Sequence, residues 1–143
     1  MKDFEKIFLD TSPLIYFLDN VPNFGDKSRK IIDFLLEENK VMISSVVTCE
    51  EYLVMPYRNN EQTLINSFWK FVIDSKMSLY PINQSDAVKA AEIRAEYKHF
   101  KPLDSLQLAV ACLQGCDLFL TNDKQLKQFD EIKCVTVEEW ELK

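Results

Sequence analysis

Glycine and histidine are scarce in this 143-residue chain, and each shortage argues against a class of function. The two glycines, Gly25 and Gly115, cannot form a glycine-rich loop that cradles phosphate, which excludes P-loop and dinucleotide-binding functions. With His99 as the single histidine, the chain is a poor match for a Ser-His or Cys-His hydrolase. Chemistry that relies on other side chains is therefore expected.

Paired cysteines and long apolar runs are also missing. Cys49, Cys112, Cys116 and Cys134 show no C-x-x-C spacing, so we expect reduced, mostly buried thiols and no zinc site. The N-terminus shows no basic region followed by an apolar stretch. No apolar run approaches the ~20 residues that a membrane span requires. These absences predict a cytoplasmic protein without a membrane partner.

The residues that are present favour a folded domain with a real core. Apolar residues make up 47% of the chain and aromatic residues 12%, which argues against disorder. The formal net charge of -6 argues against unspecific coating of nucleic acid. It leaves specific binding open, because the local field in a groove decides binding.

Apolar runs and helical stripes alternate along the sequence. Strands are predicted at residues 7–9, 41–47, 77–82, 117–121 and 132–137. Helices are predicted at residues 14–18, 28–38, 62–75, 85–100 and 103–115, with one more from Thr48 to a bend or end at Pro56 and a short piece up to Phe129. Thr11 or Ser12 is the expected cap of the first helix, and Ser85 that of the helix from residue 85. This order predicts an α/β fold over residues 1–143 as a single domain: a three-layer α/β/α arrangement with a central, mainly parallel sheet of about five strands.

Four acidic residues lie where the predicted strands and helices change over. Asp10 ends the first strand, Glu51 follows the second and Asp123 follows the fourth. Asp104 opens a helix, and it reaches the same edge of the sheet only if a helix–helix turn lies there. Ligands of parallel sheets bind at the carboxyl ends of strands, and clustered carboxylates repel one another unless a cation holds them. We therefore expect a divalent-cation site.

Each of these acids also has an ordinary structural interpretation. Asp10 and Asp123 could accept hydrogen bonds in turns. Thr48 and Glu51 have the spacing of a capping box, and Asp104 suits a helix N-terminus. Taken singly, none of the four identifies a site.

Four short segments, taken together and in order, resemble the signature segments of PIN-domain proteins. They are Ile7–Ser12, Ser45–Glu51, Leu103–Ala109 and Leu118–Asp123. The resemblance spans nearly the whole chain, and the most similar subgroup is the VapC-type ribonuclease toxins. It implies that Asp10, Glu51, Asp104 and Asp123 are the catalytic, metal-binding acids. Many family members carry a further acid where this chain has Gln125, which weakens or empties one metal position.

What the resemblance implies is a metal-dependent endoribonuclease that hydrolyses RNA phosphodiester bonds with Mg²⁺ or Mn²⁺. Hard oxygen ligands suit these ions, and such chemistry needs no histidine. Ser12, Thr121 and Asn122 would support the ligands or contact the phosphate. Arg94, Lys98, His99 and Lys101 could supply a positive rim for RNA, although a solvated helix face is the plainer interpretation.

The resemblance also implies partners. A toxin would have a small antitoxin protein, and homodimers are common in the family. Tyr52, Met55, Tyr57 and Trp69 are candidates for the exposed apolar surface that such partners need, with the core the expected place for Trp69.

Two other functions stay open. One is a non-catalytic PIN-like module that binds RNA or protein, which the Gln125 departure favours. The other is a phosphoacceptor signalling domain, which would need a lysine at the end of its last strand, whereas Lys133 starts the fifth strand.

Overall fold

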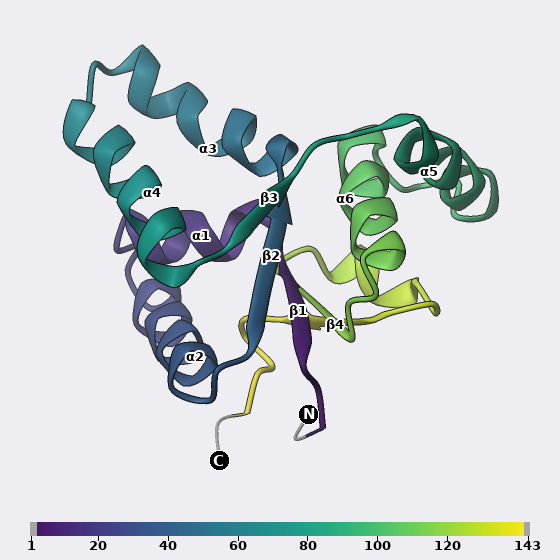
Figure 1. Cartoon of the computed structure of the whole chain (residues 1–143), viewed down its shortest axis with the longest axis horizontal. Helices are drawn as coiled ribbons and strands as arrows, with labels where there is room; N and C mark the ends of the chain where they lie inside the picture. Colours follow the sequence, from purple (N-terminus) through teal and green to yellow (C-terminus); the bar gives the residue numbers. More distant parts are fainter. Residues whose placement is uncertain (1–2, 142–143) are drawn as a thin grey trace.

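The computed structural model describes residues 3–141 and builds them around one parallel sheet (Figure 1). The strands are β1 (Lys6–Leu9), β2 (Val41–Ser45), β3 (Ser78–Tyr80), β4 (Leu118–Thr121) and β5 (Lys133–Thr136). The helices are α1 (Thr11–Leu18), α2 (Phe24–Glu37), α3 (Val46–Arg58), α4 (Gln62–Ser75), α5 (Gln84–Glu96) and α6 (Pro102–Leu113), and a 3-10 helix η1 spans Lys124–Gln128. The strand order is β3-β2-β1-β4-β5, and every neighbouring pair is parallel. The predicted α/β fold is confirmed.

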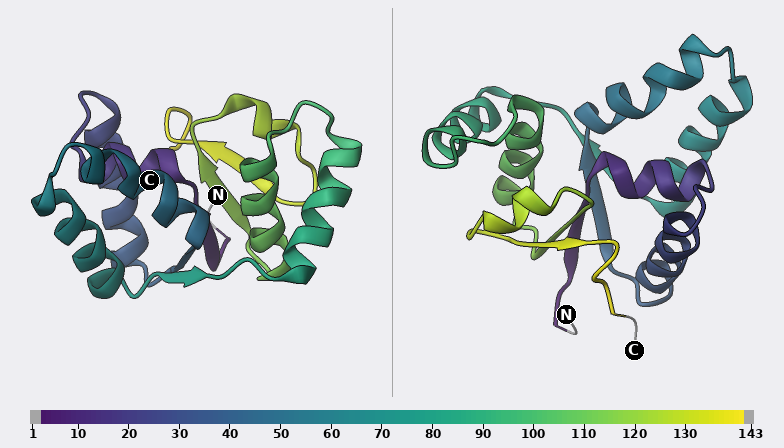
Figure 2. Two further views of the ribbon diagram at one scale, coloured as in Figure 1. Left: turned by 90° about the horizontal axis from the view of Figure 1, so that it is seen from above. Right: turned by 180° about the vertical axis from the view of Figure 1, so that it is seen from behind.

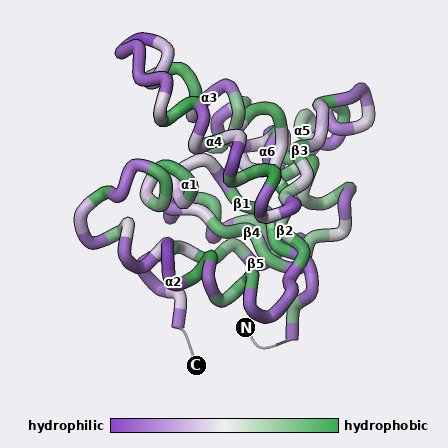
Figure 3. Tube along the Cα trace, turned by 60° about the vertical axis from the view of Figure 1, so that its left-hand side comes forward, coloured by the Kyte–Doolittle hydropathy of each residue, from purple (hydrophilic) through white to green (hydrophobic). Residues whose placement is uncertain are grey.

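Side chains that alternate along the central strands build a core on each face of the sheet. Phe8 of β1 and Phe119 of β4 stack on the face covered by α5 and α6. Ile7 and Leu9 point to the other face, where α1 and α2 pack with part of α4. Figure 2 shows the two helical layers on either side of the sheet, and Figure 3 shows the strands as the hydrophobic centre of the chain. The three predicted layers are therefore present.

The path of the chain through the sheet creates a reversal beside β1. From β1 the chain moves outward to β2 and β3, and then crosses back through α5 and α6 to β4 on the other side of β1. The carboxyl ends of β1 and β4 therefore flank the point where the strand order reverses. Such a point is where open α/β sheets bind ligands.

Three helix caps differ from the sequence prediction. Asp10, rather than Thr11 or Ser12, caps α1, and its side chain accepts the Thr11 N–H. Ser45 caps α3, so the strand predicted to run to Val47 ends two residues earlier. At α5, Asn83 and Asp86 form a capping box in place of the predicted Ser85 cap. In each case a residue just before the predicted cap satisfies the free N–H groups.

The helix predicted from Ser28 begins earlier, at Phe24, and it includes Gly25. A Cβ on Gly25 would lie 3.0 Å from the Tyr16 carbonyl oxygen and 3.1 Å from the Asn20 carbonyl carbon. Gly25 therefore allows the start of α2 to lie in close contact with the end of α1, and it does not break the helix. Gly115 has the expected role, since its φ of 70° ends α6.

The remaining element boundaries move by a few residues. Pro56 lies inside α3, which ends two residues later at Arg58, and α5 ends at Glu96 rather than Phe100. The four cysteines are free thiols, as expected. None of the helices within residues 3–141 is both long and apolar enough to cross a membrane.

Candidate active site

The four predicted acids line one pocket at the carboxyl edge of the sheet, the upper edge in Figure 1. The pocket has a volume of about 610 Å³. Its lining residues come from the ends of β1 and β4 and the starts of α1, α3 and α6: Asp10, Thr11, Ser12, Ile15, Glu51, Lys101, Pro102, Leu103, Asp104 and Asp123. The helix–helix turn between α5 and α6 brings Asp104 to this edge, as the predicted site requires.

Asp10 is the most enclosed of the four acids, with 7% of its surface exposed. Its Oδ1 accepts the Thr11 N–H at 2.8 Å, and its Oδ2 accepts the Thr121 hydroxyl at 2.8 Å. Burial raises the pKa of Asp10 to about 6 in spite of these two bonds, and the negative charges of Asp104 and Glu51 raise it further. An ionised Asp10 therefore lacks positive compensation.

Glu51 lies in the second turn of α3, and its carboxylate turns toward α1. Its Oε1 accepts the Thr11 hydroxyl at 2.6 Å. The capping box with Thr48 is absent, because α3 begins at Val46 and Ser45 supplies the cap. The ordinary structural role considered for Glu51 is therefore wrong, and its side chain is directed to the pocket.

Asp104 is the third residue of α6 and half-buried. Burial raises its pKa, and the charges of Asp123 and Glu51 raise it further, while Lys101 opposes them. Within the described residues its carboxylate accepts no hydrogen bond from a side chain or backbone N–H. The carboxylate oxygens of Asp104 are thus available to a ligand in the pocket.

Asp123 combines an ordinary role with a place in the pocket. It caps η1, where its Oδ1 accepts the Gln125 N–H at 2.9 Å, and its own N–H bonds to the Thr121 hydroxyl at 3.0 Å. The turn role considered from the sequence is therefore real. It fixes the carboxylate while Asp123 also lines the pocket.

A family model for the PIN domain matches residues 7–132, which include all four acids, β2, β3, β4 and all of β1 except Lys6, and which end just before β5. The chain belongs to the PIN-domain family. The resemblance seen in four short segments therefore holds over most of the sequence.

Known proteins with a similar sequence or fold agree with this assignment. Ribonuclease VapC1 from Aquifex aeolicus (strain VF5) is 30% identical over 138 residues, which cover 95% of this chain and 93% of the relative. A chain in the crystal structure of VapBC2 from Rickettsia felis bound to a promoter DNA fragment has a TM-score of 0.76 at 15% identity, covering 92% of this chain and 98% of that one. A chain in a toxin-antitoxin complex from Klebsiella pneumoniae has a TM-score of 0.67 at 19% identity, covering 95% and 99%. At these identities the two structures show the shared fold.

The three polar residues predicted beside the acids have different positions in this PIN domain. Ser12 lines the pocket, and Thr121 lies below it with its hydroxyl on Asp10. Asn122 does not line the pocket, and its amide nitrogen donates to the Tyr16 hydroxyl. Asn122 therefore ties the end of β4 to α1.

Sequence reasoning missed a group of buried polar residues at the pocket: Thr11, which lines it, and Ser44, Ser45, Thr48 and Gln107, which lie beneath it. Gln107 lies one turn after Asp104 on α6 and is 1% exposed. A glutamine within an apolar helical stripe was the available signal, because a buried amide must find partners.

Of the four residues predicted to form a positive rim, one lines the pocket. Lys101 lines it, just before α6, and among the described residues Lys101 forms no ion pair. Arg94, Lys98 and His99 are exposed and do not line the pocket. Arg94 is on the solvated face of α5, whereas Lys98 and His99 lie in the exposed turn after that helix.

PIN nucleases are typically metal-dependent, so we tested whether the pocket suits a cation. As the side chains lie, no three histidine, cysteine or acidic residues within 3–141 form a ready-made metal group. The donor chemistry fits nonetheless, because four carboxylates from separate segments share the pocket and two have pKa values raised by burial and mutual repulsion. Hard oxygen donors of this kind suit Mg²⁺ or Mn²⁺.

Proposed function

We propose that the chain is a metal-dependent endoribonuclease of the VapC type that acts as a single PIN domain. The observation that carries the proposal is the pocket itself: four carboxylates from four distant segments meet where the strand order reverses. The name of the Aquifex aeolicus relative, a ribonuclease, supports the same activity. Because RNA is the substrate, the cytoplasm is the proposed location.

Asp10, Asp104 and Asp123 would hold Mg²⁺ or Mn²⁺ directly, and Glu51 directly or through water. When bound, the ion lowers the pKa of a water, orients the scissile phosphate and neutralises charge on the leaving oxygen. The protein's part is to fix the acids before RNA arrives. Thr121 and the Thr11 N–H hold Asp10, the Thr11 hydroxyl holds Glu51, and the turn at η1 holds Asp123.

Lys101 is the residue that we expect to meet the RNA backbone at the pocket. Its amine is free of ion pairs among the described residues, and it borders the acids that would carry the ion. Phosphate contacts by lysine give binding without sequence preference. Ser12, on the opposite wall, remains a candidate phosphate contact.

The proposal includes a toxin role with a cognate antitoxin. The similar folds from VapBC2 and the Klebsiella pneumoniae toxin-antitoxin complex support this role. The α3–α4 hairpin offers an apolar surface, with Met55 50%, Tyr57 62% and Trp69 41% exposed. The expectation of Trp69 in the core is wrong, and so is that of an exposed Tyr52, which is buried against Phe68. The same surface would serve a homodimer.

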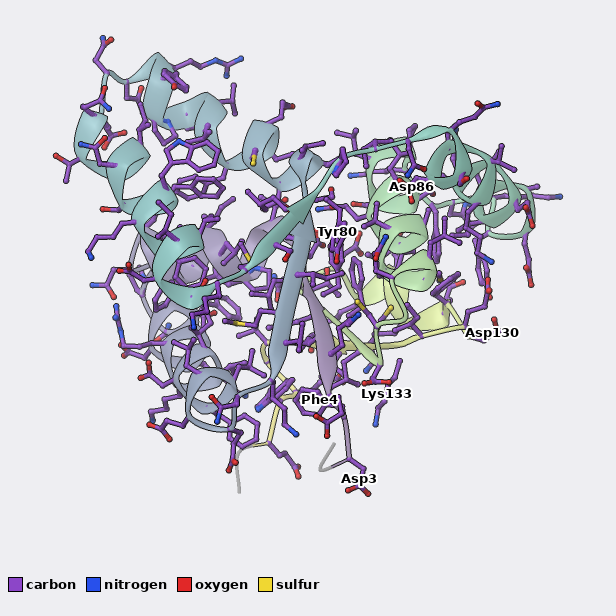
Figure 4. All side chains as sticks on the ribbon, in the orientation of Figure 1. Asp3, Phe4, Tyr80, Asp86, Asp130 and Lys133 are labelled. Carbon is purple, nitrogen blue, oxygen red and sulfur yellow. The ribbon has the colours of Figure 1, made fainter. Side chains whose placement is uncertain are left out.

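A PIN module that binds RNA or protein without cleaving it is the second candidate. It is favoured by Gln125 at the position of a further family acid, and by the absence of a ready-made metal group within residues 3–141. A phosphoacceptor domain is a poorer candidate, because Lys133 begins β5 and pairs with Leu118 at the start of β4. Leu118 in turn pairs with Ile7 of β1, so Lys133, which Figure 4 labels, lies at the end of the sheet where β1 begins.

Cleavage of structured RNA by the pure protein in Mn²⁺ tests the proposal. We expect cleavage by the native chain and a loss of at least a hundredfold in Asp10→Asn and Asp104→Asn. Asp33→Asn, an exposed acid on α2 outside the pocket, is the matched control and should cleave normally. RNA binding without cleavage would favour the non-catalytic module, and full activity in Asp10→Asn would reject the site.

A further inference from the structure

Beneath the acidic pocket lies a layer of polar side chains that is closed to water. Ser44, Ser45, Thr48 and Thr121 have 0% of their surface exposed, and Gln107 has 1%. Buried polar groups cost free energy unless they are paired, so their partners reveal what the layer holds in place.

Gln107 is the centre of this layer. Its amide nitrogen lies 2.7 Å from the Thr48 hydroxyl and 3.4 Å from Asp10 Oδ1, and its amide oxygen accepts the Ser45 hydroxyl. The three partners come from α3, the end of β1 and the end of β2. Gln107 therefore connects α6 to the start of α3 and to the ends of β1 and β2.

The chemistry of the partners fixes the orientation of the amide. Asp10 is a carboxylate that only accepts, so the amide nitrogen must face it and the amide oxygen must face Ser45. Both protons on the nitrogen then have acceptors, one on Asp10 and one on Thr48. Only this orientation of the amide gives both its nitrogen and its oxygen hydrogen-bond partners.

From Gln107 the contacts continue to the second acid. The Thr48 hydroxyl lies 3.3 Å from that of Thr11, and Thr11 donates to Glu51 Oε1 at 2.6 Å. Ser44 holds Thr48 from below at 2.8 Å and donates to the Leu9 carbonyl oxygen at 2.7 Å. A continuous path thus joins Asp10 to Glu51 through Gln107, Thr48 and Thr11.

We propose that Gln107 is a positioning residue that sets the carboxylates of Asp10 and Glu51 relative to each other for cation binding. The inference rests on the proposed function, because it assigns a role in forming the metal site. Gln107 touches neither ion nor RNA, since it lies below the pocket and does not line it. It acts through the oxygens that do.

The competing interpretation is a purely structural one, in which Gln107 is a satisfied polar residue of the core. Gln107→Met separates the two, because methionine has nearly the same length and suits a helix, but it cannot hydrogen-bond. Tyr97→Phe is the matched control. It removes the two hydrogen bonds of the Tyr97 hydroxyl with Asp130, one donated to Oδ1 at 2.9 Å and one accepted from the N–H at 3.3 Å, with little change of shape and away from the pocket lining.

The readout is Mn²⁺ affinity measured by calorimetry on the full chain without RNA, together with the melting temperature in chelator. We expect Gln107→Met to weaken Mn²⁺ binding about 10- to 100-fold, the usual effect of losing a residue that supports metal ligands. Tyr97→Phe should leave Mn²⁺ affinity unchanged even where its melting temperature falls. If Gln107→Met fails to fold, Thr48→Val cuts the same path at its middle and should weaken Mn²⁺ binding as well.

Three results would overturn the inference, and one of them would also reject the proposed function. If Gln107→Met melts at a lower temperature but binds Mn²⁺ within twofold of native, Gln107 is structural and the nuclease proposal stands. The same holds if Gln107→Met fails to fold and Thr48→Val binds Mn²⁺ within twofold of native. If the native chain binds no Mn²⁺ and cleaves no RNA, the proposed function fails with it.

Discussion

Asp10 shows how one residue can be well paired and still be costly to ionise. Its two strong hydrogen bonds favour the carboxylate, yet burial outweighs them and the pKa rises to about 6. A surface aspartate with the same two bonds would show the opposite shift. The enclosure that makes Asp10 costly to ionise would also favour the binding of the proposed cation.

The raised pKa of Asp10 predicts how stability depends on pH when no metal is bound. The unfolded chain loses this proton near the ordinary value of 3.8, and the folded chain near 6. Between these values the folded state binds more protons, so the free energy of unfolding falls as pH rises. The Asp10 contribution to this fall is on the order of 3 kcal/mol, and it is complete above about pH 7.

Urea unfolding in chelator at pH 4 and pH 7 measures this effect against Asp10→Asn, which cannot ionise. We expect the native chain to lose stability relative to the variant as pH rises, and excess Mg²⁺ to restore it at pH 7. Asp104→Asn should also melt at a higher temperature than native in chelator at pH 7, because one repelling charge is gone. A native-to-variant difference that stays constant with pH would contradict the assigned environment of Asp10.

At the residue scale, the sequence could predict which acids line the pocket but not what holds them. Asp10, Glu51, Asp104 and Asp123 stand at element ends, and that placement is visible in the pattern. The contact between Gln107 and Asp10 joins positions 97 residues apart, and no local pattern encodes it. Glu51 shows the reverse case, since a local capping pattern was present and the folded chain does not use it.

At the scale of elements, the sequence predicted every helix and strand but placed several ends wrongly. The errors concentrate at helix starts, where several neighbouring residues can cap. Ser45 and Thr48 both suit a cap before α3, and the buried hydroxyl of Thr48 is instead taken by Gln107. Tertiary contacts thus decide between local options of similar energy.

The start of α5 offers a direct test of such a choice. Asn83 accepts the Asp86 N–H at 3.0 Å, and Asp86 accepts the Asn83 N–H at 2.9 Å. Asn83→Ala should therefore lower the free energy of unfolding by about 1 kcal/mol, with RNA cleavage unchanged. Chemical denaturation measures the change.

Ser85→Ala is the matched control, because Ser85 lies inside α5 and its side chain makes none of the cap bonds. We expect almost no loss of stability from it. A larger loss from Ser85→Ala than from Asn83→Ala would show that the cap predicted from the sequence is the one that forms in solution.

For the whole molecule, the alternation of strands and helices predicted the layers, while the strand order came only from the structure. The order matters for function, because the return from β3 to β4 places the ends of β1 and β4 side by side. The Asp10 N–H even bonds to the Leu120 carbonyl oxygen at 2.9 Å. The local sequence of a long crossover does not show which strand its end will pair with. The pocket could therefore be predicted from the sequence, but the arrangement of its walls could not.

The shape of the molecule also separates the proposed partner surface from the active site. The α3–α4 hairpin extends away from the sheet, on the opposite side of the molecule from α5 (Figure 1). Tyr57 and Ile73, on this hairpin, are 62% and 73% exposed. Large apolar side chains exposed on one projecting element are typical of protein interfaces, and a tyrosine often contributes strongly to binding.

We therefore expect the double variant Tyr57→Ser, Ile73→Ser to keep RNA cleavage and to bind the proposed cognate antitoxin at least tenfold more weakly. Val88→Ser on α5 is the matched control, since Val88 is an apolar residue with 55% exposure on the other side of the molecule. Calorimetry with the purified antitoxin gives the affinities, and light scattering shows whether the variant alone changes its oligomeric state.

A weaker complex with Val88→Ser and an unchanged one with the hairpin variant would move the interface to α5. A loss of cleavage in the hairpin variant would mean that α3 and α4 support the pocket as well as the partner, because Glu51 is anchored on α3 only five residues into the helix.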